Sequence, residues 1–176
     1  MLKKYQLLFI TTALMLFYCS FAKAQCEEML GYNSQGSLGS TKSLKGHLSQ
    51  QDTAMKMFLS ATIAKTEITN GITLYGIFSK VGTIDNTTKV KITFKDNTSI
   101  TLTDYLNASN NPNPQNNNIG FFTALITDKY NLLLLKTKPV IKVQITGSQL
   151  DATTYIVDGI VAIDFLLGMD CLQQYL

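Results

Sequence analysis

The chain has 176 residues with 15 basic and 12 acidic side chains, and its length suits one domain built around one core. Every basic residue is lysine, so the chain lacks the arginine fork that binds phosphates and guanine bases through paired hydrogen bonds. We therefore expect that nucleic acid is not a partner.

The N-terminal segment has the pattern of an export signal. Two lysines precede an apolar run over residues 7–18, and the small-x-small site that signal peptidases recognise ends at Ala24. We predict a signal peptide over residues 1–24, with Gln25 as the new N-terminus and a periplasmic, cell-surface or extracellular location. The apolar run is shorter than the ~20 residues of a membrane-spanning helix, so no stable membrane span is expected after cleavage.

Two alternatives remain open for this segment. It could be retained as an anchor, or Cys19 could carry a lipid, although Tyr18 stands where the lipobox pattern requires a small residue. Cleavage would also remove three lysines, which leaves 12 basic against 12 acidic residues. The positive charge of the whole chain therefore belongs to the leader.

Two cysteines remain after cleavage, one at each end of the mature chain. Because exported proteins fold in oxidising compartments, we predict a disulfide between Cys26 and Cys171. The bond would join the two ends of the chain and contribute roughly 2 to 4 kcal/mol to stability. The alternative is a pair of buried free thiols.

The segment after the leader is rich in Gly, Ser, Gln and Asn and has no sustained apolar period. We predict a flexible N-terminal arm over residues 25–55, with at most one short strand pairing. It contains His47, the single histidine, which we interpret as a solvated side chain. Thr53, between Asp52 and Ala54, resembles an O-glycosylation triplet of some exported bacterial proteins and is a candidate modification site.

The β-rich domain is expected over residues 56–176, beginning with a strand that is apolar on both faces. Asn70-Gly71 follows this strand and is typical of a two-residue hairpin turn. A turn there would place Ala64 opposite Ile77. Gly76 in the return strand indicates a bulge or a close backbone approach.

The clearest pattern in the chain is a β-hairpin over residues 89–102, where apolar and polar side chains alternate. A two-residue loop would send Ile100 to the solvent face. A three-residue loop with Asn97 in the left-handed conformation instead places all the large apolar groups on one face. The predicted pairs are Phe94 with Thr98, Ile92 with Ile100, and Val90 with Leu102.

Residues 107–118 are mostly Asn, Ser, Pro and Gln, without a large apolar side chain. Pro112 and Pro114 argue against a strand, because proline cannot donate a ladder hydrogen bond. We interpret this segment as a loop, with a disordered tip favoured over a binding loop.

Further elements follow this loop. Between residues 119 and 147 the pattern predicts a buried strand, a brief helix capped by Asp128 and another strand. The last strand is predicted over residues 155–163 and the last helix over residues 163–172. An apolar stripe on that helix would bring Cys171 near the N-terminal arm.

The sequence offers few candidate catalytic residues. A serine or cysteine nucleophile needs a base, and His47 is the single candidate. Zinc requires clustered His and Cys ligands, so no metal and no cofactor are expected. The acids that could act in pairs are scattered, mostly at turns: Asp104, Asp128, Asp151, Asp158, Asp164 and Asp170.

Several tyrosines could form a binding patch, although tyrosines that partly cover a sheet are the commoner explanation. The residues concerned are Tyr32, Tyr75, Tyr105, Tyr130 and Tyr155.

These patterns predict a mainly β fold: a single antiparallel β-sandwich or curved sheet of about six to eight strands with a short C-terminal helix. For function we expect an exported, non-catalytic module that binds, or is a structural accessory to, an unidentified protein or glycan. The alternative is a small secreted hydrolase that uses a carboxylate pair.

Overall fold

A computed structural model describes most of the chain. The residues that it describes are 25–33, 41–45, 48–51, 56–65, 70–79, 87–103, 105–113, 117–147 and 150–176. The predicted signal peptide, His47, Thr53, Asp104 and Pro114 lie outside these ranges.

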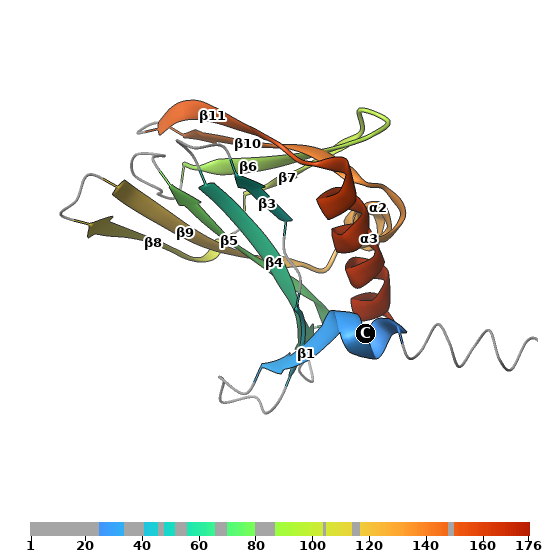
Figure 1. Ribbon diagram of the computed structural model, residues 1–176. Helices are drawn as coiled ribbons and strands as arrows, with labels where there is room; N and C mark the ends of the chain where they lie inside the picture. Colours follow the sequence, from blue (N-terminus) through green and yellow to red (C-terminus); the bar gives the residue numbers. More distant parts are fainter. Residues whose placement is uncertain are drawn as a thin grey trace, which may run out of the picture.

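The described part of the chain contains two antiparallel sheets (Figure 1). The larger sheet has seven strands in the order β1-β2-β4-β5-β9-β8, with β3 also paired to β4. Its strands are β1 (Leu30–Asn33), β2 (Thr41–Leu44), β3 (Leu48–Gln51), β4 (Lys56–Lys65), β5 (Asn70–Ser79), β8 (Tyr105–Asn113) and β9 (Asn117–Ile126).

The smaller sheet has four strands in the order β11-β10-β6-β7. Its strands are β6 (Lys89–Phe94), β7 (Ser99–Leu102), β10 (Val140–Gly147) and β11 (Leu150–Ile156). Residues 25–29 form a short helical segment, and two longer helices complete the fold, α2 (Lys129–Thr137) and α3 (Gly159–Gln173). Figure 1 shows both helices on one side of the two sheets.

The core lies between the sheets and under the helices. Phe78 of β5 stacks on Phe122 of β9, with ring centroids 5.3 Å apart, and also contacts Tyr155 of β11 at 5.6 Å. All three rings are almost completely buried. Because side chains of the two sheets meet in one core, the predicted mainly β, sandwich-like fold is confirmed.

The hairpin formed by β6 and β7 has the predicted register. Val90 pairs with Leu102 and Ile92 with Ile100, and the Phe94 amide donates to the carbonyl oxygen of Thr98 at 2.9 Å. Local alternation and the chemistry of its turn were sufficient to predict this element.

The register of β4 and β5 differs from the prediction. Ala64 pairs with Gly71, not with Ile77, and Asn70 is itself a strand residue. A Cβ atom on Gly71 would collide with the carbonyl oxygen of Ile126 in β9. Gly71 is therefore a strand residue that permits a close approach between β5 and β9. The sequence pair Asn70-Gly71 resembles a turn signal, but it does not form a turn here.

The predicted flexible arm is also corrected for its described residues, which form a short helical segment over residues 25–29 and three strands of the larger sheet. β2 joins β4 at Ser43 and Thr62, and the Thr62 hydroxyl donates to the carbonyl oxygen of Lys42 at 3.0 Å. Leu30 and Leu44 are buried. A few well-placed apolar residues and backbone pairing are enough for these short strands, and this part of residues 25–55 belongs to the same sheet as strands of residues 56–176.

The described residues of the predicted Asn-rich loop form most of β8 and the first two residues of β9. Pro112 is paired in register with Asn118. This is compatible with proline because β8 is the last strand of its sheet, so one side of its backbone needs no partner. Together with the N-terminal strands, β8 raises the number of strands in the described residues to eleven, above the predicted six to eight.

The last strand ends earlier than predicted, and the last helix begins earlier. Residues 160–163 belong to α3, because Asp158 caps the helix: its Oδ1 accepts from the Ile160 amide at 2.8 Å. The carboxylate satisfies an amide that has no partner within the helix. A short apolar run is compatible with a strand or with a helix. Here the N-cap Asp158 determines that residues 160–163 are helical.

Candidate functional site

The two helices form a layer on one side of the molecule, and they run in opposite directions. Near the end of α3, the Gln173 side chain donates to the carbonyl oxygen of Leu132 in the first half of α2 at 2.8 Å. Pro139, just beyond α2, lines the same groove as Ile163 in the first half of α3. α2 begins as predicted at Asp128, whose Oδ1 accepts from the Asn131 amide at 2.8 Å.

One side of α3 is packed into the fold. Its buried residues are Ala162, Phe165, Gly168, Met169, Cys171 and Leu172. A Cβ atom on Gly168 would lie 2.8 Å from a methyl carbon of Leu44, so glycine lets the helix approach β2 closely. The helix orientation is therefore set by its contacts with the sheet.

The opposite side of α3 is apolar and exposed to solvent. Ile160, Ile163 and Leu167 have exposed fractions of 74%, 51% and 42%. Their spacing of three and four residues places them in one row on the helix. Isolated exposed apolar residues are ordinary on a protein surface, whereas a continuous row indicates a contact site.

The neighbouring helix α2 also has two exposed apolar residues, Tyr130 and Leu133, which are 60% and 47% exposed. We use the term helix face for the five residues Tyr130, Leu133, Ile160, Ile163 and Leu167. Four of its side chains are aliphatic and one is aromatic.

Two grooves adjoin the helix face. One, of about 430 Å³, lies at the start of α3 and is lined mainly by apolar groups, among them Ile141, Val157 and Ile160. The other, of about 510 Å³, lies between α2 and the C-terminus and includes Leu133 and Gln173. The apolar surface is therefore hollowed at both ends, as expected of a surface that receives side chains.

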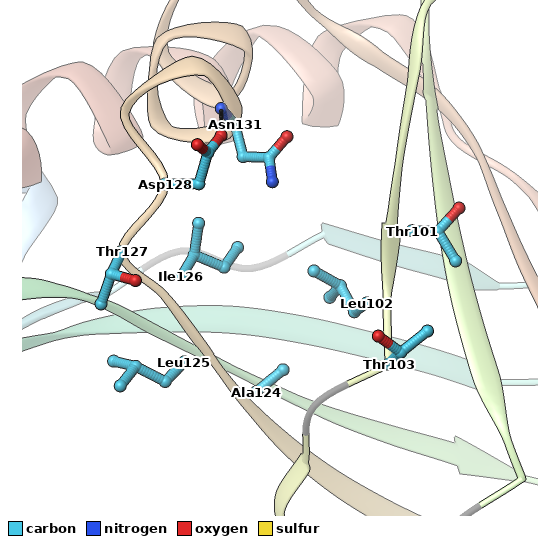
Figure 2. Close-up of a pocket in the computed structure, with 9 residues that line it drawn as sticks. All are labelled: Thr101, Leu102, Thr103, Ala124, Leu125, Ile126, Thr127, Asp128 and Asn131. Atoms are coloured by element: carbon cyan, nitrogen blue, oxygen red, sulfur yellow. Dashed lines mark hydrogen bonds between the residues drawn. The ribbon is translucent and has the colours of Figure 1, made fainter.

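A smaller cavity, of about 150 Å³, lies where β7 and β9 end and α2 begins (Figure 2). Thr101, Thr103 and Thr127 supply hydroxyl groups to its wall. Figure 2 shows the Asp128 carboxylate beside the backbone nitrogen of Asn131, the contact that caps α2. The carboxylate at this cavity therefore already has a structural role.

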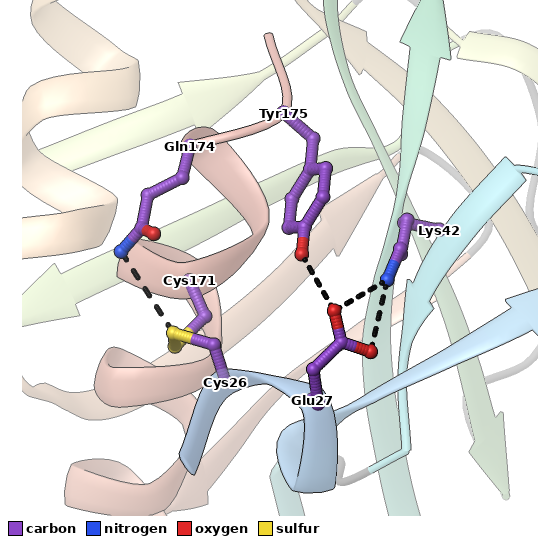
Figure 3. The surroundings of a disulfide bond; sticks show 6 residues. All are labelled: Cys26, Glu27, Lys42, Cys171, Gln174 and Tyr175. Carbon is purple, nitrogen blue, oxygen red and sulfur yellow. Dashed lines mark hydrogen bonds and ion pairs between the residues drawn. A yellow bond between two sulfur atoms is a disulfide. The ribbon is translucent and has the colours of Figure 1, made fainter. Parts of the chain in front are cut away.

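The cysteines predicted to pair are brought together at the end of α3 (Figure 3). Cys26 and Cys171 form a disulfide, with Cα atoms 5.3 Å apart and both residues buried. Beside it, Glu27 accepts from Lys42 Nζ at 3.3 Å and from the Tyr175 hydroxyl at 3.2 Å. The disulfide and these hydrogen bonds hold the N-terminal segment against the C-terminus.

Two of the acids considered as catalytic candidates have structural roles in the described part of the chain. No group of three or more potential metal ligands occurs there. Asp128 and Asp158 cap helices.

The described tyrosines lie on different elements and do not form the binding patch that was considered as an alternative. Tyr155 is buried in the core, and burial raises its pKa to about 12. Tyr75 on β5 is half-buried near Phe58, with ring centroids 6.5 Å apart, and Tyr130 lies on α2. The side chains of Tyr32 and Tyr105 lie outside the described residues.

Sequence reasoning missed the helix face because it assigned residues 160–163 to a strand. The signal was present: Asp158 is a good N-cap, and apolar residues follow at helical spacing. Which side of the helix would remain exposed depends on the packing of Phe165, Met169 and Leu172, which requires the tertiary structure.

No protein-family model, curated protein or solved structure matches the chain. Among the described residues, no helix combines the length and apolar character needed to cross a membrane.

Proposed function

We propose that this chain is an exported, non-catalytic module that binds a protein partner through the helix face. The observation that carries the proposal is the exposed row of Ile160, Ile163 and Leu167 on an otherwise well-packed helix. Burying an aliphatic side chain of this size contributes about 1.5 to 3 kcal/mol, so covering the row would be favourable.

The chemistry of the helix face favours a protein over a glycan. Glycans are commonly held by flat aromatic rings and polar groups, and this face has one ring, Tyr130, among aliphatic side chains. A partner with apolar side chains could fill the grooves at both ends of the face.

Export is supported by the disulfide and by the composition of the N-terminal segment. A bond that joins Cys26 to Cys171 across 145 positions of sequence is typical of proteins that fold in an oxidising compartment. The short apolar run before Ala24 has the length of a signal peptide.

The proposal is tested by capture from the organism's own envelope or culture fluid. The bait is the tagged chain, expressed from its whole sequence and purified in oxidised form. We expect at least one protein to be captured by the wild type and reduced about tenfold or more by Ile163→Asp, because the substitution places a charge in the contact.

The matched control is Ile77→Asp, an exposed isoleucine on β5 outside the helix face. It should capture the same protein as the wild type, and melting curves must show that both variants remain folded. Equal capture by the wild type and by Ile163→Asp would contradict the proposal.

A further inference from the structure

The charges around the helix face differ between its two helices. α2 carries Lys129 and Lys136, and both line the groove between α2 and the C-terminus. α3 carries the exposed acids Asp164 and Asp170 and has no basic residue along its length. One helix of the face is therefore basic and the other is acidic.

The acids of α3 lie on either side of its apolar row. Asp164 follows Ile160 by four residues and precedes Leu167 by three, and Asp170 follows Leu167 by three. On a helix these spacings make neighbours on the surface. Neither of the ion pairs of the described residues, Lys42 with Glu27 and Lys138 with Asp96, uses the four charges of the helix face.

From this pattern we infer that the partner of the helix face is a second copy of this chain. A two-fold axis that runs between the helices and along them would place α2 of each protomer on α3 of its partner. The lysines of one copy would then meet the aspartates of the other on both sides of the axis. This inference rests on the proposed function, and it names the partner.

The spacing of the charges suits this arrangement. Lys129 and Lys136 are seven residues apart on α2, and Asp164 and Asp170 are six apart on α3. At 1.5 Å per residue these separations are about 10.5 and 9 Å along the helix axes. Because α2 and α3 are antiparallel within one chain, α2 and the partner's α3 would also be antiparallel, so Lys129 of one copy would approach Asp170 of the other and Lys136 would approach Asp164.

The size of the face indicates a weak dimer. α3 has 15 residues and is about 22 Å long, and two helices side by side are about 20 Å wide. The contact would bury roughly 400 to 500 Å² on each copy, which is near the lower limit for a specific interface. We therefore expect a dissociation constant of about micromolar or weaker, and weaker association at high salt.

Sedimentation velocity of the oxidised chain, expressed from its whole sequence, tests the inference over a series of concentrations and salt strengths. The wild type should shift from monomer to dimer with concentration, and salt should reverse the shift. Lys129→Glu/Lys136→Glu and Asp164→Lys/Asp170→Lys should each remain monomeric, because like charges would face each other.

Mixing these two variants should restore the dimer, because each contact then pairs opposite charges again. The restored dimer also shows that both variants are folded. Lys89→Glu/Lys91→Glu, on the exposed side of β6, is the control with the same change in net charge and should dimerise like the wild type.

A wild type that stays monomeric throughout, or a dimer that neither variant weakens, would overturn the inference. Capture that depends on Ile163 would then still support the binding module, with a different protein as its partner.

Discussion

Asn97 has a backbone conformation that side chains other than glycine rarely adopt. Its φ is 66°, and it is the one non-glycine residue with positive φ among those described. Asn97→Gly should keep or raise the melting temperature, because glycine enters this region without strain. Asn97→Ala should lower stability by about 1 kcal/mol. A clear loss of melting temperature with glycine would show that the turn has been placed wrongly.

Asp96 makes the neighbouring turn dependent on pH. Its carboxylate accepts hydrogen bonds from Lys138 and from the backbone and hydroxyl groups of Thr98. These hydrogen bonds lower the pKa of Asp96 from 3.8 to about 2, and the bond from Lys138 has the largest effect. The charged form of the Asp96 carboxylate is therefore more stable in the folded state than in the unfolded state.

The resulting stabilisation is fully present above pH 3.8 and is lost as the pH falls toward 2. Asp96→Asn should melt at a lower temperature than the wild type at neutral pH, and the difference should disappear near pH 2. Melting curves at several pH values measure this. A difference that stays constant across this range would contradict the assigned role.

At the scale of elements, Gly76 allows β5 and β9 to pack closely. A Cβ atom at this position would collide with the ring of Phe122. Gly76→Ala should therefore destabilise the fold by about 1 to 3 kcal/mol. Gly159→Ala is the matched control, because nothing lies within 4 Å of its Cβ position at the start of α3. Chemical denaturation of both variants measures the contrast, and equal effects would contradict it.

Elements with a local cause could be predicted from the sequence. The β6–β7 hairpin follows from alternation and from the residues of its turn, and α2 follows from Asp128 and the apolar residues after it. In both cases the deciding contacts join residues close in sequence.

Elements that depend on distant partners could not be predicted in the same way. β8 is a strand because it pairs with β9, and β2 is a strand because it pairs with β4. The register of β4 and β5 depends on β9, which approaches Gly71. The candidate site was missed for the same reason, since exposure of Ile163 depends on what α3 packs against.

At the scale of the whole molecule, the disulfide joins the two ends of the described chain. Figure 1 shows the C-terminus beside the N-terminal segment, where Cys26 and Cys171 meet. Replacing both cysteines with serine should lower the free energy of unfolding by about 2 to 4 kcal/mol. Denaturation of the oxidised wild type and this variant measures the loss. Two free thiols in the wild type, found by non-reducing mass spectrometry, would contradict the pairing.

The helix face depends on interactions at all three levels. Asp158 caps the start of α3, and packing against the core fixes the orientation of the helix. Ile163 is exposed as a result. The most direct test is a photoreactive amino acid placed at Ile163 in cells that produce the protein, compared with the same probe at Ile77. We predict a cross-link to a protein, either a second copy or another partner, from position 163 and not from position 77. No cross-link at position 163, or an equal one at both positions, would contradict the account.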